Sequence, residues 1–280
     1  MSRQDQSADR PQPQSQPKIQ SRSQYWLHVA RKDFADAVRS GRLWSFLILF
    51  FAIALYLLFN VSGDEAIESF GSVMRLLLPV VAVMAGYMAI VGERETGSIR
   101  MMLSLPVKRS DVLIGKYLGR CAVVIFSVFL AFGLAALTAV LRYGGLPINA
   151  YGAFLLQAIL VGAVFSAIAV GCSASVSSQR RAVSVVIGVI LIFQLFWRDI
   201  VRELYGTFGG DIEGSTPTLV ETADQLSPMT AIDTAVSGLN VISTSELPVF
   251  QEWVSAVIIM MWIVGPLTIG YLLFRNSDIS

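Results

Sequence analysis

Six long apolar stretches dominate the pattern of hydrophobic and polar positions along the chain. A helix that rises about 1.5 Å per residue needs roughly 20 such residues to cross the hydrocarbon core of a bilayer. The pattern therefore predicts an all-α, polytopic membrane protein. We expect its six transmembrane helices at about residues 43–61, 73–92, 112–141, 151–172, 182–201 and 253–274.

Two longer polar segments flank these helices. Residues 1–24 contain seven Gln, five Ser and three Pro but no apolar run, which predicts a disordered tail and no signal peptide. The second segment, residues 202–250, joins the last two apolar stretches. In it, Ser227 and Pro228 resemble the start of a helix, and Ile232, Val236 and Leu239 follow at helical spacing. We expect one or two short amphipathic helices there, with an unstructured loop as the alternative.

The basic residues are distributed unevenly between the two ends of the predicted helices. If the six helices alternate in direction, 17 Lys and Arg side chains lie on one side and three on the other, with Arg75 near the outer end of the second helix. Cytoplasmic segments of membrane proteins carry an excess of Lys and Arg. We therefore expect a multi-pass protein of the plasma membrane with both termini in the cytoplasm and residues 202–250 outside the cell membrane.

Composition and charge narrow the classes of function. Charged residues make up 15% of the chain, against about 25% in an average soluble protein, and the mean hydropathy is +0.63. A net charge of +1 lacks the basic excess of a nucleic-acid-binding protein. Cys121 and Cys172 are far apart and form no CxxC pair, which argues against a disulfide scaffold or a zinc ribbon.

Few ionisable side chains fall within the predicted membrane helices. Arg75 is placed so that its side chain can extend outward, and we expect Lys116 and Arg120, at the start of the third helix, to remain at the level of the lipid headgroups. An ion-driven carrier or a channel with a charged filter needs such groups at mid-depth. Both classes are therefore disfavoured.

Motifs of catalysis are missing as well. The one histidine, His28, precedes the first membrane helix, and the chain has no HExxH, GxSxG or metal-ligand cluster. A GxxxxGK[ST] phosphate-binding loop is also missing, because Tyr117 follows Gly115-Lys116 and Ser110 stands where the first glycine would be. We predict no catalytic, cofactor-binding or metal-binding residue on this chain, so that any nucleotide hydrolysis would take place on a separate subunit.

An amphipathic helix is predicted over residues 25–40, just before the first membrane helix. Basic residues cover one side of it, so we expect it to lie in the membrane interface, where anionic lipids attract them. Gly41 favours a bend after this helix, and a straight cytosolic extension of the first membrane helix is the alternative. The apolar side comprises Trp26, Leu27, Ala30, Phe34, Ala37 and Val38, with Val29 as an apolar exception on the polar side.

The segment between the second and third membrane helices changes from charged to apolar. Residues 93–98 are charged or polar, and residues 99–105 are mostly apolar. Ser98 can cap a short helix, and Pro106 must end it. Such a helix could dock into a cleft on a soluble partner, although an ordinary basic cytoplasmic loop is the alternative. Its apolar face would comprise Ile99, Met102 and Leu103.

Three motifs of this region occur together: Glu93-Arg94-Glu95-Thr96-Gly97-Ser98, Leu103-Ser104-Leu105-Pro106 and Gly115-Lys116-Tyr117-Leu118. Together they resemble the signature of ABC-2 type transporter permeases, the membrane subunits of prokaryotic ABC exporters. The helix at 25–40 resembles that family's elbow helix, and residues 171–181 resemble its second cytoplasmic turn. The likeness covers about residues 25–280, which would form one ABC-2 type transmembrane domain. It is loosely closest to the permeases associated with multicopper-enzyme maturation.

The resemblance implies both a partner and an interface. In that family the loop after the second helix forms a coupling helix, which contacts a separate ATP-binding subunit, and two permeases work with two such subunits. ATP would then bind the partner, and the second permease would be identical or paralogous. Carried over, the ATPase contact would comprise Glu93, Arg94, Glu95, Thr96, Gly97, Ser98, Ile99, Met102, Leu103 and Pro106, with a second cytoplasmic contact at Ser178, Gln179, Arg180 and Arg181.

The function expected from the resemblance is that of the transmembrane permease subunit of an ATP-driven exporter. A membrane scaffold or assembly factor that recruits a cytosolic partner through the same loop is the main alternative. An intramembrane enzyme and a secondary carrier are further alternatives, and the missing acid, base and metal-binding residues argue against both.

Overall fold

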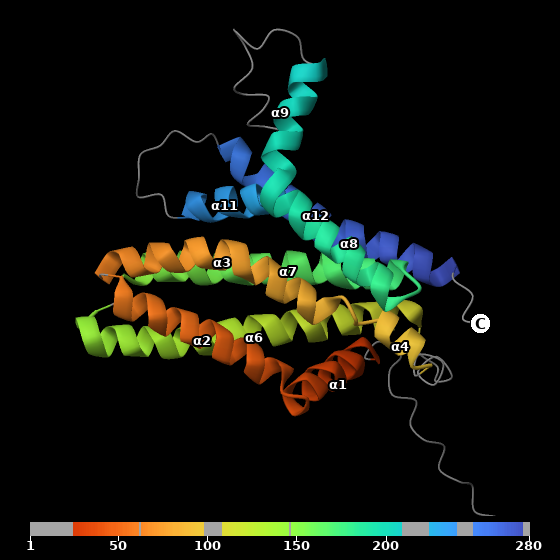
Figure 1. The fold of residues 1–280 in the computed structure, drawn as a ribbon, viewed down its shortest axis with the longest axis horizontal. Coiled ribbons are helices and arrows are strands. Elements are labelled where there is room, and N and C mark those ends of the chain that lie inside the picture. The colour runs from red at the N-terminus through yellow and green to blue at the C-terminus, as the bar shows by residue number, and fades with distance from the viewer. Residues whose placement is uncertain are drawn as a thin grey trace, which may run out of the picture.

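The computed structural model describes residues 25–61, 63–97, 108–145, 147–208, 224–239 and 249–276. Within these ranges every regular element is a helix, which confirms the predicted all-α class. The elements are α1 (Tyr25–Arg39), α2 (Arg42–Asn60), α3 (Gly63–Gly86), α4 (Val91–Glu95), α6 (Arg109–Tyr143), α7 (Ile148–Ser175), α8 (Gln179–Leu191), η2 (Ile192–Phe196), α9 (Trp197–Phe208), α11 (Pro228–Leu239) and α12 (Val249–Asn276) (Figure 1).

Six helical stretches of the described chain are long and apolar enough to cross a membrane, which confirms the predicted number. α2, α3, α6 and α7 lie side by side along the length of the molecule, and the α8–η2–α9 helix runs obliquely to them (Figure 1). α12 packs along α7. The stretches are Arg42–Asn60, Ser69–Glu95, Arg109–Tyr143, Ile148–Ser175, Gln179–Leu204 and Trp253–Arg275.

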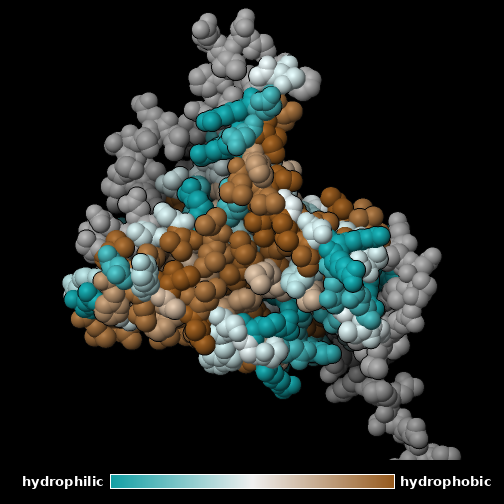
Figure 2. Space-filling model, in the orientation of Figure 1, coloured by the Kyte–Doolittle hydropathy of each residue, from teal (hydrophilic) through white to brown (hydrophobic). Residues whose placement is uncertain are grey.

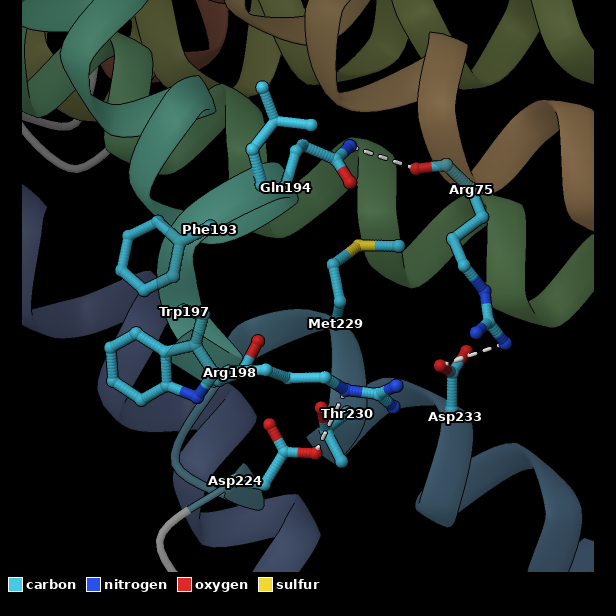
Figure 3. Close-up of a pocket in the computed structure, with 11 residues that line it drawn as sticks. Arg75, Phe193, Gln194, Trp197, Arg198, Asp224, Met229, Thr230 and Asp233 are labelled. Carbon is cyan, nitrogen blue, oxygen red and sulfur yellow. Dashed lines mark hydrogen bonds and ion pairs between the residues drawn. The ribbon is translucent and has the colours of Figure 1, made fainter. Parts of the chain in front are cut away.

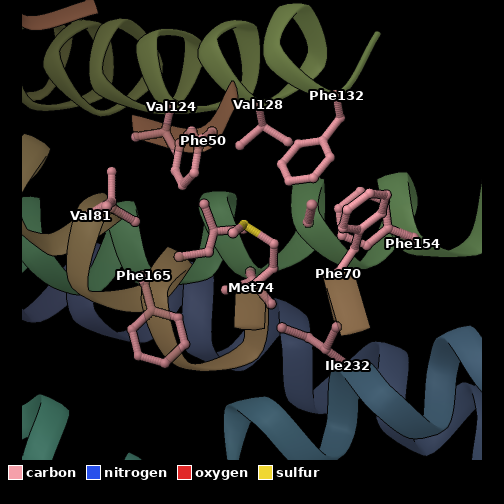
Figure 4. Close-up of a cluster of buried hydrophobic side chains, with 14 of the residues drawn as sticks. Phe50, Phe70, Met74, Val81, Val124, Val128, Phe132, Phe154, Phe165 and Ile232 are labelled. Carbon is pink, nitrogen blue, oxygen red and sulfur yellow. The ribbon is translucent and has the colours of Figure 1, made fainter. Parts of the chain in front are cut away.

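Aromatic side chains fill the centre of the bundle (Figure 4). The ring centroid of Phe132 lies 4.7 Å from that of Phe154 and 5.4 Å from that of Phe70. Phe50 of α2 lies 6.5 Å from Phe132 on another side. Rings at these distances and in tilted or edge-on arrangements attract one another. Since lipid is as apolar as the core, such close packing, rather than removal from water, holds membrane helices together.

Two glycines bring α7 and α12 into close contact. A Cβ on Gly171 would stand 2.3 Å from the carbonyl oxygen of Pro266, and a Cβ on Gly270 would stand 2.7 Å from the carbonyl oxygen of Gly171. Any larger residue at either position would push the two backbones apart. The crossing therefore depends on glycine at both positions.

α1 is separate from α2 and packs along the start of α6. Gly41, between them, has a φ of +80°, a left-handed conformation that glycine adopts easily. The face of α1 that packs on α6 does not coincide with its apolar side. Leu27, on the apolar side, is 50% exposed, whereas Val29, the apolar exception on the polar side, packs so closely on α6 that a Cβ on Gly115 would stand 2.6 Å from its Cβ. The reason is that Gly115 leaves room for the Val29 side of α1 to approach α6.

The fifth membrane helix continues past its predicted end and changes its winding. α8, η2 and α9 follow one another without a break, and the five residues of η2 form a π-helical turn. α11 begins at Pro228, as the Ser227-Pro228 pair predicts. It packs against α7 and α12, so that part of the predicted outer segment rests on the bundle.

Apolar side chains cover much of the outside of the molecule. Ile48 of α2, Leu195 of η2 and Met260 of α12 are between 59% and 63% exposed. An apolar surface extends over the middle of the molecule, and hydrophilic residues gather towards the end that holds α4 and the last turns of α12 (Figure 2). A bilayer would cover this apolar surface.

Candidate functional site

Those predicted contact residues that the structure describes lie around α4, close to five other helices. We call this region the α4 junction. It is held by residues of α1, α4, α6, α7, α8 and α12, at one end of the bundle (Figure 1). They are Asp33, Glu93, Arg94, Glu95, Arg109, Lys116, Arg120, Ser173 and Phe274 with their side chains and Gln179 with its backbone N–H.

A serine from another helix caps the start of α4. Ile90, at the N-cap position, has no side chain that can accept hydrogen bonds from the first amides of the helix. The hydroxyl of Ser173, which is fully buried in α7, instead accepts hydrogen bonds from the N–H groups of Ile90 and Val91, at 3.0 and 3.1 Å. The beginning of α4 is therefore attached to α7.

Four charged side chains join α1, α4 and α6. The ammonium of Lys116 lies 2.7 Å from Glu93 and 3.5 Å from Asp33. The guanidinium of Arg120 contacts both carboxylate oxygens of Asp33, with its Nε 2.8 Å from Oδ2 and its Nη2 3.0 Å from Oδ1. Its third nitrogen donates to the carbonyl oxygen of Ala85, at 3.0 Å, near the end of α3. Asp33 is therefore the anchor through which α1 is held to α6.

This cluster adds burial to the expectation for two bases. Lys116 and Arg120, predicted at the level of the lipid headgroups, are enclosed by the protein, with only 3% and 7% of their surfaces exposed. Two carboxylates inside the protein, rather than water or lipid phosphate, neutralise them. A charge inside a protein is tolerated only with such a partner, since removing it from water is otherwise costly.

Two arginines cap the ends of α7 and α12. Arg94 donates to the carbonyl oxygens of Ala174 and Val176, at 3.3 and 3.1 Å, where α7 ends. Arg109 donates to the carbonyl oxygens of Phe274 and Arg275, both at 2.7 Å. Both guanidinium groups also lie over the ring of Phe274, at 5.1 and 5.4 Å from its centroid. The last carbonyls of a helix need donors, and cations suit that end of its dipole.

The two predicted contact regions adjoin each other. The carboxylate of Glu95, at the end of α4, accepts a hydrogen bond from the backbone N–H of Gln179, the first residue of α8, at 2.7 Å. The hydroxyl of Ser178 accepts from the N–H of Arg181 at 3.5 Å and caps α8. An anion at the start of a helix stabilises it. The junction therefore links α4 directly to the turn between α7 and α8.

A comparison with known protein families identifies the wider group. Residues 27–279 match a family described as ABC-2 family transporter protein. The chain belongs to the ABC-2 transporter family. A protein of Stutzerimonas stutzeri, named probable ABC transporter permease protein NosY, is 28% identical and aligns with 91% of this chain and 99% of its own length. A protein of the same name from Pseudomonas aeruginosa is 26% identical and aligns with 90% of this chain and 98% of its own length.

The predicted contact residues of this ABC-2 chain divide into two groups. Glu93 and Arg94 are partly buried and bind other helices of the same chain. Five others are exposed: Glu95, Thr96, Gly97, Arg180 and Arg181. Ser178 and Gln179 are half-buried beside them. Ser98, Ile99, Met102, Leu103 and Pro106 lie outside the described residues.

Sequence reasoning did not identify the acid and the serine that complete the junction. Asp33 falls on the same helical stripe as Ala30 and Ala37, which marks it as an acid on an otherwise small and apolar face. Lys116 and Arg120 are four residues apart and so lie on one face of a helix. The acid on the face of one helix and the two bases on the face of another could have suggested an ion pair between these helices. Ser173, among other small residues of α7, carried no such signal.

A second polar group lies away from the junction, around Asp233 of α11. Its carboxylate contacts Arg75 of α3 at 2.9 Å and accepts a hydrogen bond from the side-chain amide of Gln157 in α7 at 2.6 Å. Burial raises the pKa of Asp233 above its ordinary value, and the nearby Arg75, Gln157 and Arg198 lower it and offset part of that rise. Arg75, expected to extend outward, is half-exposed and also holds α11 to α3.

Proposed function

We propose that this chain is the transmembrane permease subunit of an ATP-driven exporter of the ABC class, energised by a separate ATP-binding subunit. Its family membership and two relatives that bear the name of probable ABC transporter permeases support the general role, that of a multi-pass permease in the plasma membrane. Such a chain is a transport subunit rather than an enzyme. The outward direction, the ATP-binding partner and the cytoplasmic position of both termini are the finer parts of the proposal.

The observation that carries the proposal is the hydrogen bond between Glu95 and the backbone of Gln179. It joins the end of α4 to the start of α8, so a partner that binds one of them meets the other as well. The exposed surface around this bond contains Thr96, Gly97, Arg180 and Arg181. We propose that residues 93–106 and 178–181 together form the docking region of the ATP-binding subunit, in which Glu93 and Arg94 hold the region to the bundle from inside the chain and residues 95–106 and 178–181 are the docking surface that meets the partner. Two such subunits and a second permease, identical or paralogous, would complete the transporter.

The α4 junction suggests how a push on that surface would reach the membrane helices. α4 is tied to α6 through Glu93 and Lys116, to α7 through Ser173, and to α12 through Arg94 and Phe274. Asp33 adds α1 to the same group. Closure of the nucleotide-bound partners would therefore move several helices together. ATP can shift this equilibrium only as far as it binds the two states with different affinity.

Two substitutions on the docking surface test the proposal. Arg181→Glu and Met102→Asp should each insert normally but weaken the association with the ATP-binding subunit, because the first reverses a charge and the second puts a carboxylate on the apolar face. Arg202→Glu, at an exposed arginine of α9, is the matched control and should bind normally. The measurements are co-purification of the subunit and vanadate-sensitive ATP hydrolysis in the complex. Normal association of both variants would contradict the docking surface.

The same complex separates transport from a scaffolding role. A transporter should lose ATP hydrolysis and solute movement together when the partner is removed. A complex that assembles through residues 93–106 but neither hydrolyses ATP nor moves any solute would identify a membrane assembly factor instead. Transport by the purified chain alone, driven by a proton or sodium gradient, would contradict the need for an ATP-binding partner.

A further inference from the structure

A cavity of about 220 Å³ lies between η2, α9, α11 and α3. Trp197, Arg198 and Asp224 stand on one side of it and Arg75 and Asp233 on the other, with α11 running between them (Figure 3). Its volume is several times the roughly 30 Å³ that one water molecule occupies in the liquid. Neither the family match nor the names of the relatives assign a role to it.

Two buried polar atoms that lack a hydrogen-bond partner belong to side chains that line this cavity. They are the indole Nε1 of Trp197, which can only donate, and Oδ1 of the Asp224 carboxylate, which can only accept when ionised. Buried polar atoms nearly always have a partner, because an unpaired one costs free energy. A molecule that forms hydrogen bonds with both atoms must carry an acceptor for the indole N–H and a donor for the carboxylate oxygen.

The charges around the cavity indicate where each end of such a molecule would lie. Arg75 contacts Asp233 at 2.9 Å through Nη2, and Arg198 contacts Asp224 at 3.4 Å through Nε. A guanidinium carries five N–H groups, so both retain donors for an anion. The start of α11, with Thr230 in the cavity wall, adds the positive end of a helix dipole.

The opposite end of the molecule would be a cation. Asp224 is the carboxylate with the unpaired oxygen, and the rings of Phe193 and Trp197 stand in the same wall, 5.3 Å apart. An ammonium group can donate to the carboxylate and lie against an aromatic ring. The cavity therefore matches a zwitterion with an anionic and a cationic end, rather than a simple anion or cation.

An apolar surface continues from the cavity along η2. Leu195 lines the cavity and is 59% exposed, and its neighbours Ile192 and Phe196 are 43% and 51% exposed. All three belong to a helical stretch that is apolar enough to lie in a bilayer. A hydrocarbon chain attached to the zwitterion could lie against them.

We propose that this cavity binds a phosphoethanolamine group, with its phosphate at Arg75 and Arg198 and its ammonium at Asp224, and that a membrane lipid supplies this group. The indole N–H of Trp197 donates to a phosphate oxygen. The proposal does not depend on an ATP-binding partner, and it can be tested on the full chain alone.

The test is native mass spectrometry of the full chain in detergent with added lipid. Phosphatidylethanolamine should bind with an apparent Kd about tenfold lower than phosphatidylglycerol, which has the phosphate but no ammonium. Asp224→Asn, which removes the charge that faces the ammonium, should abolish most of that difference. Trp197→Phe, which keeps a ring but removes the N–H that faces the phosphate, should weaken the binding of both lipids. Trp44→Phe and Asp199→Asn, at exposed positions that do not line the cavity, are the matched controls and should bind like the unaltered chain.

A soluble competitor distinguishes the source of the group. If free phosphoethanolamine binds with the same dependence on Trp197 and Asp224, the headgroup chemistry is supported and a solute can supply it. If it does not compete while phosphatidylethanolamine binds, the lipid itself is the ligand. Equal binding of the two lipids, an unchanged preference in Asp224→Asn, or unchanged affinity for both lipids in Trp197→Phe would overturn the proposal.

Discussion

At the scale of single residues, a few charges have the largest consequences. Only 15% of the chain is charged, yet Asp33, Lys116 and Arg120 are all buried at the α4 junction. Each is tolerated because the others neutralise it. The same side chains would be unremarkable on a wet surface, where exposed ion pairs contribute little. Loss of any one of them should therefore destabilise the folded chain more than loss of a charge on the surface would.

Lys116→Met should destabilise the folded chain by about 3–5 kcal/mol, because it leaves the Glu93 carboxylate without this cation and removes one from Asp33. Chemical unfolding in detergent micelles, followed by tryptophan fluorescence, measures the free energy of unfolding. Lys32→Met, at an exposed lysine of α1, is the control and should change it much less. Equal losses in the two variants would show that the buried cluster has no special role in stability.

Asp233 should make stability depend on pH. Burial raises its pKa in the folded state from the ordinary value of 3.8, so the folded chain holds this proton more tightly than the unfolded chain does. Its contribution to stability is therefore complete below pH 3.8 and is lost as the pH rises through the raised pKa. Asp233→Asn should lose less stability over that pH range. Thermal unfolding at a series of pH values measures this.

The control for this pH dependence is Asp199→Asn, which alters an exposed aspartate of α9. It should keep the pH profile of the unaltered chain. A profile for Asp233→Asn that coincides with that of the unaltered chain would show that burial does not raise the pKa of this carboxyl group.

At the scale of elements, close contacts between helices depend on a few glycines. The α7–α12 crossing needs Gly171 and Gly270, and the α1–α6 contact needs Gly115. Other glycines of the membrane helices, such as Gly133, have open space around them. A glycine in a membrane helix therefore identifies a crossing only when the partner backbone is known.

Gly171→Ala should destabilise the chain by about 1–3 kcal/mol, because its Cβ would stand 2.3 Å from a backbone oxygen of α12 that cannot rotate away. Gly133→Ala is the matched control on α6. It has room for a methyl group and should be neutral or slightly stabilising, since alanine favours a helix over glycine. The difference in unfolding temperature measures the effect, and similar values for both variants would contradict the close crossing.

At the scale of the whole molecule, one end holds the α4 junction, and an apolar surface extends over the middle of the molecule (Figure 2). The α4 junction connects α1, α6, α7, α8 and α12 to the short segment that we propose as the docking surface for an ATP-binding subunit. The buried and the exposed residues of this region should therefore have different effects on a transporter.

Glu93→Gln should reduce the amount of solute moved per ATP hydrolysed without weakening association with the ATP-binding subunit, because it loosens α4 from Lys116 inside the chain. Arg181→Glu should instead weaken association with the ATP-binding subunit, while the complexes that still form move the usual amount of solute per ATP hydrolysed. A reconstituted complex in liposomes measures both quantities, and Glu203→Gln on α9 is the control. Loss of association in Glu93→Gln at unchanged stability would instead make Glu93 a direct contact of the partner.

The sequence alone determined the helical class, the number of membrane helices and the family, because each rests on information that is local in the chain. A run of about 20 apolar residues has only one common structure in a bilayer, and the motifs of residues 93–118 lie close together in the sequence. The start of α11 at Pro228 is also a local effect of a proline at the first turn.

Only the tertiary structure decided which charges are buried and which side chains meet. Asp33 and Arg120 are separated by 87 residues, and Ile90 and Ser173 by 83. No pattern of neighbouring residues in the sequence distinguishes a base that faces lipid headgroups from one that pairs with a carboxylate on another helix. The electrostatic free energy of each of these groups depends on partners that the fold brings together, and so their burial follows from the packing of the helices.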